Sequence, residues 1–259
     1  MPKYEKTQKG NPHKLTVNQH IIPKASIKRF SREDGSVDIY ITKDKNKIRF
    51  KPENSFFCAM RVWNQNAESG YMKDIEDQYQ KLIVNLVKRP SRDITTNENR
   101  VISEMFALWN CRWNIDRQPL PQIKYKNVKA LAFNPNKEER ERLEKVGISP
   151  IYEENNEFTI AKRDILAPII RLNIIRVVEE LEGSNWKLVE SAHGQFIFPD
   201  NAKNIDYMPV TPKFCLIHCA AYNQIYYKDL TALNNNSISN SVKYFFANDL
   251  KNCPNDLGI

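Results

Sequence analysis

The spacing of apolar residues changes twice along this 259-residue chain, and these changes limit the folds that it can adopt. In the first 64 residues, segments such as Ser36–Ile41 and Lys47–Phe50 alternate between apolar and polar side chains, which predicts strands that pair as a hairpin. From Tyr71 the apolar residues recur every three or four positions, which predicts amphipathic helices. Alternation returns after residue 186. The pattern predicts an α+β fold.

We expect one domain over residues 1–259. It would contain a basic β-rich opening over 14–64, a mainly helical middle over 71–182, and strands plus a terminal helix over 186–248. The expected helices lie at about 71–89, 97–113, 137–146, 168–181 and 237–248, and the later strands at 148–159 (a pair), 186–190, 195–198 and 213–219. Residues 1–13 would form a loose arm, and 114–135 a loop.

Two of these helices carry specific expectations. The segment 168–181 is strongly apolar and has Pro168 at its predicted first position, so it should be the central core helix. The segment 137–146 is highly charged and is closed by Gly147, so it should face solvent.

The formal net charge of +8 is concentrated near the beginning of the chain. Residues 1–60 contain 13 Lys/Arg and 6 Asp/Glu, which leaves a net charge of only +1 for the remainder. A basic segment of this kind favours a polyanionic partner, nucleic acid first. The alternative is a solvated face that keeps the protein soluble.

Several features predict a soluble protein of the cytoplasm. No apolar run reaches the roughly 18 residues of a membrane span, and the first residues do not resemble a signal peptide. The five scattered cysteines are odd in number, which fits a reducing compartment. Cys215, His218 and Cys219 cluster within an apolar strand pattern, and no second pair completes a zinc site, so structural cysteines are favoured over metal ligands.

The segment from Asn18 to Phe30 contains one of only four histidines, His20, followed by Ile-Ile-Pro. Pro23 favours extended geometry in the residue before it, which predicts His20 at the end of a short strand. Imidazole is the side chain best suited to proton transfer near neutral pH. Lys24, Lys28 and Arg29 follow it and are candidate contacts to nucleic-acid phosphates.

Motifs of many common enzymes are missing from the chain, including GxxxxGK[ST], GxGxxG, GxSxG and HExxH. One weak pattern fits a ββα metal nuclease, with His20, Asn54 and Asn64 in the three signature positions. In such a site the imidazole activates water while a metal neutralises the charge that develops on the phosphate. The residue before the histidine is usually a metal ligand, and here it is Gln19, which is a poor one.

The chain resembles the bacterial domain-of-unknown-function family 4238. The resemblance begins with His20-Ile21-Ile22-Pro23 followed by Ile27, Lys28-Arg29 and Phe30. It continues with Ile75-Glu76, the apolar helix from Met105 to Arg112, and the segments Phe196–Asn201 and Met208–Pro212. We know no established activity for that family, so the resemblance implies a set of residues and no mechanism.

This resemblance singles out His20, Glu76, Arg112, Asp200 and Asn201 as candidate catalytic residues. If they converge, His20 is the proton-transfer residue, Asp200 and Glu76 hold a divalent metal (Mg or Mn), and Arg112 binds phosphate. Structural roles stay open for each. Asp200 and Asn201 can hold a turn, Glu76 and Arg112 can form a buried ion pair, and His20 can be a core histidine.

The sequence therefore predicts a nucleic-acid-cleaving enzyme, of the kind found among toxins and phage-defence effectors. A non-catalytic module that binds nucleic acid or protein is the alternative. An enzyme for a small phosphorylated metabolite is a third possibility. The sequence does not distinguish RNA from DNA, and it leaves the oligomeric state open.

Overall fold

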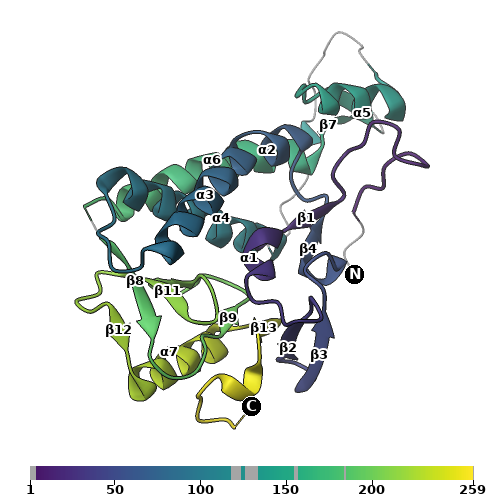
Figure 1. Ribbon diagram of the computed structural model, residues 1–259. Helices are drawn as coiled ribbons and strands as arrows, with labels where there is room; N and C mark the ends of the chain where they lie inside the picture. The colour runs from purple at the N-terminus through teal and green to yellow at the C-terminus, as the bar shows by residue number, and fades with distance from the viewer. Residues whose placement is uncertain (1–3, 118–123, 126–133, 155–156, 184, 259) are drawn as a thin grey trace.

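The computed structural model describes residues 4–117, 124–125, 134–154, 157–183 and 185–258 (Figure 1). The helices are α1 (Lys24–Lys28), α2 (Gln65–Ser69), α3 (Tyr71–Lys88), α4 (Thr96–Arg117), α5 (Lys137–Lys145), α6 (Lys162–Glu180) and α7 (Tyr227–Asn240), with 3-10 helices η1 (Ser55–Phe57) and η2 (Leu250–Asn252). The strands are β1 (Asn18–His20), β2 (Val37–Ile41), β3 (Asn46–Phe50), β4 (Cys58–Met60), β5 (Lys124–Tyr125), β6 (Ile151–Glu154), β7 (Glu157–Ile160), β8 (Trp186–Ser191), β9 (Phe198–Pro199), β10 (Tyr207–Pro209), β11 (Phe214–His218), β12 (Gln224–Ile225) and β13 (Tyr244–Ala247). The α+β prediction is confirmed.

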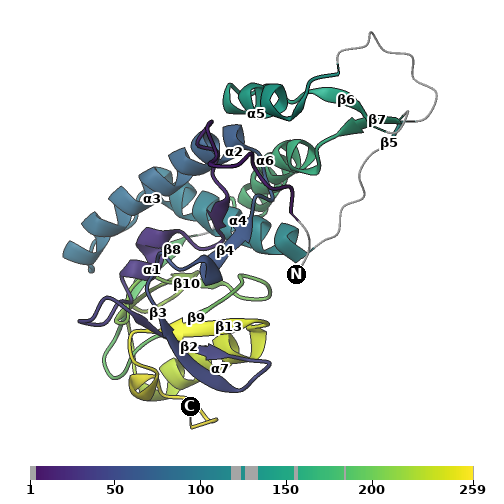
Figure 2. The same ribbon diagram turned by 90° about the vertical axis from the view of Figure 1, so that its right-hand side faces the viewer.

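A layer of helices lies over a layer of sheets. Figures 1 and 2 show α3, α4 and α6 on one side, and β2, β3, β9 and β13 with α7 on the other. Strands β1 and β4 form a small antiparallel pair between these layers. A third unit, made of α5 and the strands β5–β7, projects beyond the helical layer (Figure 2).

The predicted hairpin near the N-terminus is confirmed. Strand β2 pairs with β3 from Val37↔Phe50 to Ile41↔Asn46. Strand β13 pairs antiparallel with the other side of β2, so the sheet has the order β3-β2-β13-β9 and β3 is its edge strand. Two segments that are about 200 residues apart in the sequence therefore share one sheet.

The prediction of a terminal helix over 237–248 was wrong. Helix α7 ends at Asn240, and Tyr244–Ala247 forms strand β13. The four residues of β13 are all buried, with Phe245 and Phe246 on opposite faces of the sheet. A strand buried on both faces has no polar residue to reveal its period, and here it was mistaken for one side of a helix.

The C-terminal sheet has the order β10-β11-β8-β12. It confirms the strands expected at 186–190 and 213–219, which pair antiparallel from Trp186↔His218 to Glu190↔Phe214. The strand expected at 195–198 is reduced to β9, which begins at Phe198. Cys215 is buried in β11, whereas Cys219 lies beyond the strand and is exposed.

The first two helices of the middle region are confirmed, but α6 differs from the prediction. It begins at Lys162, so Pro168 lies inside the helix rather than at its start. Ile170 and Ile174 are buried, whereas Leu172 is 66% exposed and Ile175 is 49% exposed. Helix α6 thus packs against α4 with one face only, and some of its apolar residues lie on the exposed face. It is therefore not the central core helix that was predicted.

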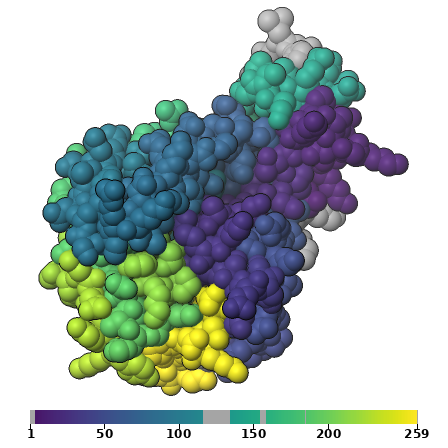
Figure 3. Space-filling view, in the orientation of Figure 1, coloured from purple at the N-terminus to yellow at the C-terminus, as the bar shows by residue number. Residues whose placement is uncertain are grey.

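The charged helix α5 and the N-terminal arm also differ from the prediction, because each packs against the other (Figure 3). Glu144 is 3% exposed, and its Oε2 accepts hydrogen bonds from Arg61 Nη2 at 2.5 Å and Arg163 Nε at 2.8 Å. Glu141 accepts from the backbone N–H of Gln8 at 2.9 Å, and Glu5 pairs with Arg163. The charges of α5 therefore do not all face solvent, because buried arginines compensate them.

The structure describes only part of the segment 114–135, which was predicted to be a loop. Helix α4 continues to Arg117, and Lys124–Tyr125 forms β5, which pairs with β7. Residues 118–123 and 126–133 lie outside the described residues. The strand pair expected around Asn155-Asn156 is confirmed as β6 and β7, with those two residues outside the description.

Aromatic rings join the two layers. Phe30, which follows α1, makes edge-to-face contacts with Phe198 of β9 at 5.7 Å and Phe246 of β13 at 5.5 Å. Trp109 of α4 packs on Phe198 at 5.1 Å. This cluster fixes the segment that carries His20 against the core. None of the described helices has the length and the apolar character needed to cross a membrane.

Candidate functional site

His20 is the last residue of β1, as the sequence predicts. The side chains of β1 alternate, so the preceding Gln19 is 1% exposed and braces the chain by bonding Trp63 O at 2.7 Å and Val62 N at 2.6 Å. His20 points to the opposite face and is half-buried. It is therefore placed at the boundary between core and solvent.

One ring nitrogen of His20 is held by the backbone. Nε2 lies 3.0 Å from the carbonyl oxygen of Pro52. A carbonyl oxygen only accepts, so Nε2 must be the donor, and in the neutral ring Nδ1 then carries a lone pair. Among the described residues Nδ1 makes no hydrogen bond. A backbone carbonyl that fixes one nitrogen and leaves the other as a base is a common arrangement for a proton-transfer histidine.

Cys58 lies beside His20 on the same face of the strand pair. The bonds Ile21 N→Phe57 O (3.2 Å) and Arg61 N→Val17 O (2.9 Å) make His20↔Cys58 a non-hydrogen-bonded pair, in which side chains approach most closely. Burial, aided by the charge of Glu68, raises the pKa of the Cys58 thiol to about 11. The thiol is protonated at neutral pH, which argues against a nucleophilic cysteine.

The loop that holds His20 is basic on its surface. Lys51, directly before Pro52, is exposed, and so is Lys24 at the start of α1. The Lys24 ammonium pairs with Glu53 at 3.7 Å, with more than half of each side chain in solvent. Such an exposed pair is weak and can exchange for a stronger anion. The loop beside His20 thus carries exposed cations.

Lys28 and Arg29 have different environments, although they are neighbours. Lys28 is exposed. The Arg29 guanidinium donates to Val210 O at 2.9 Å, to Ser26 Oγ at 3.2 Å and to Gln80, and burial lowers its pKa. These contacts brace α1 against α3 and β10. They do not fit the phosphate contact that we expected of Arg29.

Glu76 and Arg112 form an ion pair between α3 and α4. Arg112 is 1% exposed, its guanidinium lies over the Trp63 ring at 5.2 Å, and Glu68 is 3.8 Å away. The Glu76 side chain is 26% exposed. The alternative of a helix-to-helix ion pair is therefore confirmed, and it explains why a charge lies on the apolar stripe of α4.

Asp200 and Asn201 form a brace behind β13. The Asp200 carboxylate accepts from Val242 N at 3.0 Å, Lys243 N at 2.7 Å and Asn201 Nδ2 at 2.8 Å. Asn201 Nδ2 also donates to Asn240 O at 2.7 Å, and both residues are almost fully buried. They fix the connection from α7 to β13. An Asx bond from Lys203 N to Asn201 Oδ1 at 3.0 Å confirms the turn-forming alternative for Asn201.

The five candidate residues thus divide into three groups of contacts. Glu76 is joined to Arg112 and Asp200 to Asn201, and within the described chain no hydrogen bond or ion pair links His20 to either pair. Glu68 interacts both with Cys58, the neighbour of His20, and with Arg112. His20 is the member whose chemistry is not already used by the fold.

The two predicted metal ligands, Asp200 and Glu76, already have other partners. Both oxygens of Asp200 bind backbone N–H groups, and Glu76 binds Arg112. No group of three or more His, Cys, Asp or Glu that can hold a metal occurs among the described residues. Asp200 and Glu76 therefore do not fit the divalent metal that was predicted for them.

The ββα pattern gives a similar result. Strands β1 and β4 form an antiparallel pair that is followed by α2, with His20 in the expected place. Asn54 caps η1, whereas Asn64 caps α2 and donates to Asp164 at 3.0 Å. The two strands are separated in the chain by α1, β2, β3 and η1, and the side chains of Asn54 and Asn64 are occupied by structural bonds.

Some residues of the site have no sequence motif. Pro52, which orients His20, and Cys58, which lies beside it, are defined only by the pairing of β1 with β4. A local signal does exist for the cations, because residues 43, 45, 47, 49 and 51 are all Lys or Arg. Two of these residues, Lys47 and Arg49, lie in β3 and share one exposed face of it.

A family model described as "Protein of unknown function (DUF4238)" matches residues 18–220. The chain belongs to this family. The DUF4238 match contains all five candidate catalytic residues but ends before α7 and β13, which complete the sheet beside the N-terminal hairpin. No curated protein and no solved structure gives a significant match.

Proposed function

We propose that this DUF4238 protein cleaves phosphodiester bonds in nucleic acid, with His20 as the proton-transfer residue. The observation that carries the proposal is the His20 ring, which is held through Nε2 by Pro52 O and leaves Nδ1 free to accept a proton. The exposed cations Lys24, Lys28 and Lys51 supply attraction for the phosphates.

In the proposed reaction Nδ1 takes the proton of the attacking hydroxyl or water as its oxygen bonds to phosphorus. The resulting imidazolium keeps Nε2–H on Pro52 O and can return the proton to the leaving oxygen. Lys24 can release Glu53 and move to the phosphate. A role as a toxin or phage-defence effector acting in the cytoplasm belongs to the same proposal.

A binding module without catalysis is the second candidate. It is favoured by the contacts of Glu76, Arg112, Asp200 and Asn201, all of which bind one another or the backbone. In that case His20 joins β1 to the loop at Pro52, and the basic surface alone carries the function.

The test compares two single substitutions, His20→Gln and His193→Gln. His193 is exposed in a turn and is the matched control. Purified proteins are incubated with labelled single- and double-stranded RNA and DNA, with and without a chelator, and folding is checked by circular dichroism. Loss of general acid–base catalysis lowers the rate about 100-fold or more.

We expect cleavage by the wild type and by His193→Gln and its loss in folded His20→Gln. Unchanged cleavage by His20→Gln would overturn the role of His20. Binding of nucleic acid by the wild type without cleavage of any substrate would establish the binding module instead. Loss of cleavage on chelation would show that a metal is required and that its ligands are residues other than Asp200 and Glu76.

A further inference from the structure

A row of cations follows the edge strand β3. Lys47 and Arg49 alternate with the half-buried Ile48 and Phe50, so their side chains leave the same face of the sheet. Lys45 precedes them in the hairpin turn and Lys51 follows directly, and all four cations are exposed. We call Lys45, Lys47, Arg49 and Lys51 the β3 cation row.

Ion pairing neutralises little of this row. Arg49 Nε donates to Asp38 Oδ1 at 2.7 Å, which also raises the pKa of Arg49. Lys45, Lys47 and Lys51 form no ion pair within the described part of the chain. The two terminal nitrogens of Arg49 likewise have no partner there. The outer edge of its guanidinium is therefore available as a fork for a phosphate.

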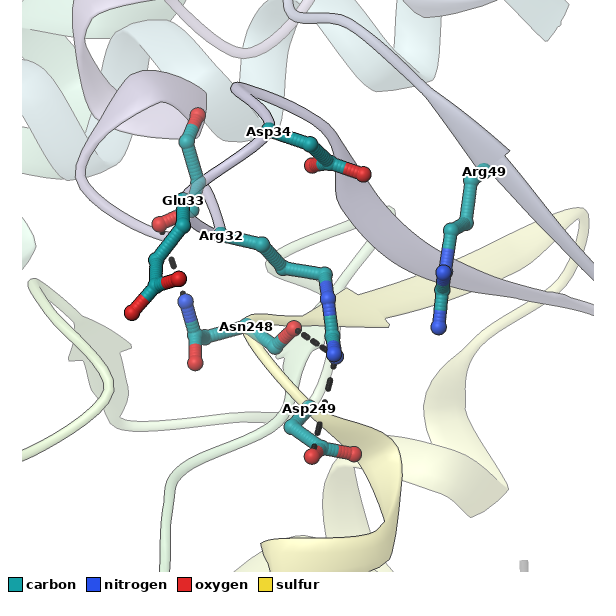
Figure 4. Close-up of a pocket in the computed structure, with 7 residues that line it drawn as sticks. Arg32, Glu33, Asp34, Arg49, Asn248 and Asp249 are labelled. Carbon is teal, nitrogen blue, oxygen red and sulfur yellow. Dashed lines mark hydrogen bonds and ion pairs between the residues drawn. The ribbon is translucent and has the colours of Figure 1, made fainter.

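A hollow of about 540 Å³ opens beside Arg49 (Figure 4). It is also lined by a second arginine, three carboxylates and two neutral polar residues: Arg32, Glu33, Asp34, Asp249, Ser31 and Asn248. Figure 4 shows both guanidinium groups directed into it. Arg32 is held by Asp249 at 3.6 Å and by Asn248 O at 3.2 Å. Asp34 Oδ1 accepts hydrogen bonds from the backbone N–H of Ser36 at 2.8 Å and from its hydroxyl at 2.6 Å.

A second hollow of about 360 Å³ adjoins the first, since Arg49 lines both. Lys47 and Lys251 are among its lining residues. The two hollows therefore follow β3, and the second one brings Lys251 of η2 beside the row. Together the two hollows form a path lined by both cations and carboxylates, in which the β3 cation row supplies Lys47 and Arg49.

The β3 cation row itself, rather than either hollow, ends beside the loop residue that orients His20. Lys51 precedes Pro52, whose carbonyl oxygen holds the imidazole, so the last cation of the row is next to the residue that orients His20. Cations two residues apart along a strand are separated by roughly 6.6 Å, and from Lys47 to Lys51 by roughly 13 Å. A row of this length spans several consecutive phosphates of one strand.

We propose that the β3 cation row binds the backbone of a single-stranded nucleic acid and leads it to His20. The proposal deepens the function proposed above and rests on it for the role of His20. A single strand is favoured over a duplex because one straight row of charges follows one flexible backbone, whereas duplex phosphates lie in two rows across a groove. Edge-strand lysines also discourage sheet-to-sheet aggregation, and the experiment separates that role from binding.

The test removes three charges at once in two matched variants. The row variant replaces its three lysines, Lys45, Lys47 and Lys51, with Gln and keeps Arg49. The control variant replaces Lys81, Lys137 and Lys145 with Gln and removes three exposed charges from α3 and α5. Binding of a labelled single-stranded 20-mer and of the corresponding duplex is measured by fluorescence anisotropy over a range of salt concentrations. Every protein carries His20→Gln, so that no substrate is cleaved during the measurement.

We expect the row variant to bind the single strand at least about tenfold more weakly at low salt. Its slope of log K against log[salt] should be smaller by about 2, because each lost contact to a single strand removes about 0.7. The control variant should match the parent protein. Equal losses in the two variants would overturn the proposal and reduce the row to general charge. Stronger binding of the duplex than of the single strand would overturn the choice of occupant.

The same substitutions in a protein with His20 intact separate this proposal from the enzymatic one. Weakened binding by the row variant, with no cleavage by any protein, supports the row and overturns the nuclease. Cleavage by the wild type that the row variant retains at low substrate concentration overturns the row and leaves the nuclease standing.

Discussion

The polar residues around His20 and those around Asp200 differ in what the fold leaves unused. Asp200 is 2% exposed, and its carboxylate accepts hydrogen bonds from the backbone of the α7–β13 connection. His20 is half-buried and uses one ring nitrogen on Pro52, while the other makes no bond among the described residues. Both belong to the matched family region, so membership of a motif does not distinguish a brace from a reactive group.

The pair Glu76–Arg112 belongs with Asp200 in this comparison. Arg112 lies against Trp63 and between two carboxylates, and its position is set by the packing of α3 on α4. Replacing Glu76, Arg112 or Asp200 should therefore lower the free energy of unfolding. His20 and the β3 cation row should affect binding or catalysis and leave stability nearly unchanged.

The largest change in stability is expected for Arg112→Ala. It deletes a buried guanidinium and leaves Glu76 and Glu68 without their shared cation, so we expect the free energy of unfolding to fall by about 3 kcal/mol. Urea denaturation followed by tryptophan fluorescence measures it. Arg100→Ala, which removes an exposed arginine of the same helix, is the control. A loss below about 1 kcal/mol would show that Arg112 is not a brace and would return it to the candidates for phosphate binding.

A smaller loss of about 2 kcal/mol is expected for Asp200→Ala, because the N–H groups of Val242 and Lys243 lose their acceptor and both residues are exposed. The exposed Asp206→Ala is the control. Urea denaturation again gives the measurement. If the protein is nucleolytic and folded Asp200→Ala loses cleavage without losing stability, the division between braces and reactive residues is refuted at this position.

The smallest effect concerns an ion pair at the surface. Hydrogen bonds from Arg92, with a further bond from the backbone of Thr95, lower the pKa of the Glu98 carboxyl to about 2. Because the folded-state pKa is depressed, the stabilisation is present above the unfolded value of about 4.3 and is lost as the pH falls towards 2. Solvent screening limits it to about 1 kcal/mol or less.

Glu98→Gln should therefore lower the melting temperature slightly at pH 7 and bring it together with the wild-type value near pH 2. Differential scanning calorimetry over that pH range makes the comparison. A difference between the two proteins that is independent of pH would assign the effect to helix capping rather than to charge.

Local pattern was sufficient wherever an element has one buried face. The hairpin of β2 and β3, the helix α3 and the strand end at His20 all follow from the spacing of apolar residues and from Pro23. The cation row is also visible in the sequence, because exposed strand positions repeat every second residue. In each of these cases the neighbouring residues in the chain carry the information.

Only the tertiary structure decided which polar groups have hydrogen-bond or ion-pair partners within the fold. Tyr244–Ala247 became a strand because β2 and β9 lie on either side of it, and α5 turned acidic residues inward because Arg61 and Arg163 were there to pair with Glu144. Whether Asp200 is reactive or bracing depends on the N–H groups of residues 242 and 243. The physical reason is that spacing along the chain reports which residues face the core, whereas a charge or hydrogen bond is satisfied by partners that only the fold brings within reach.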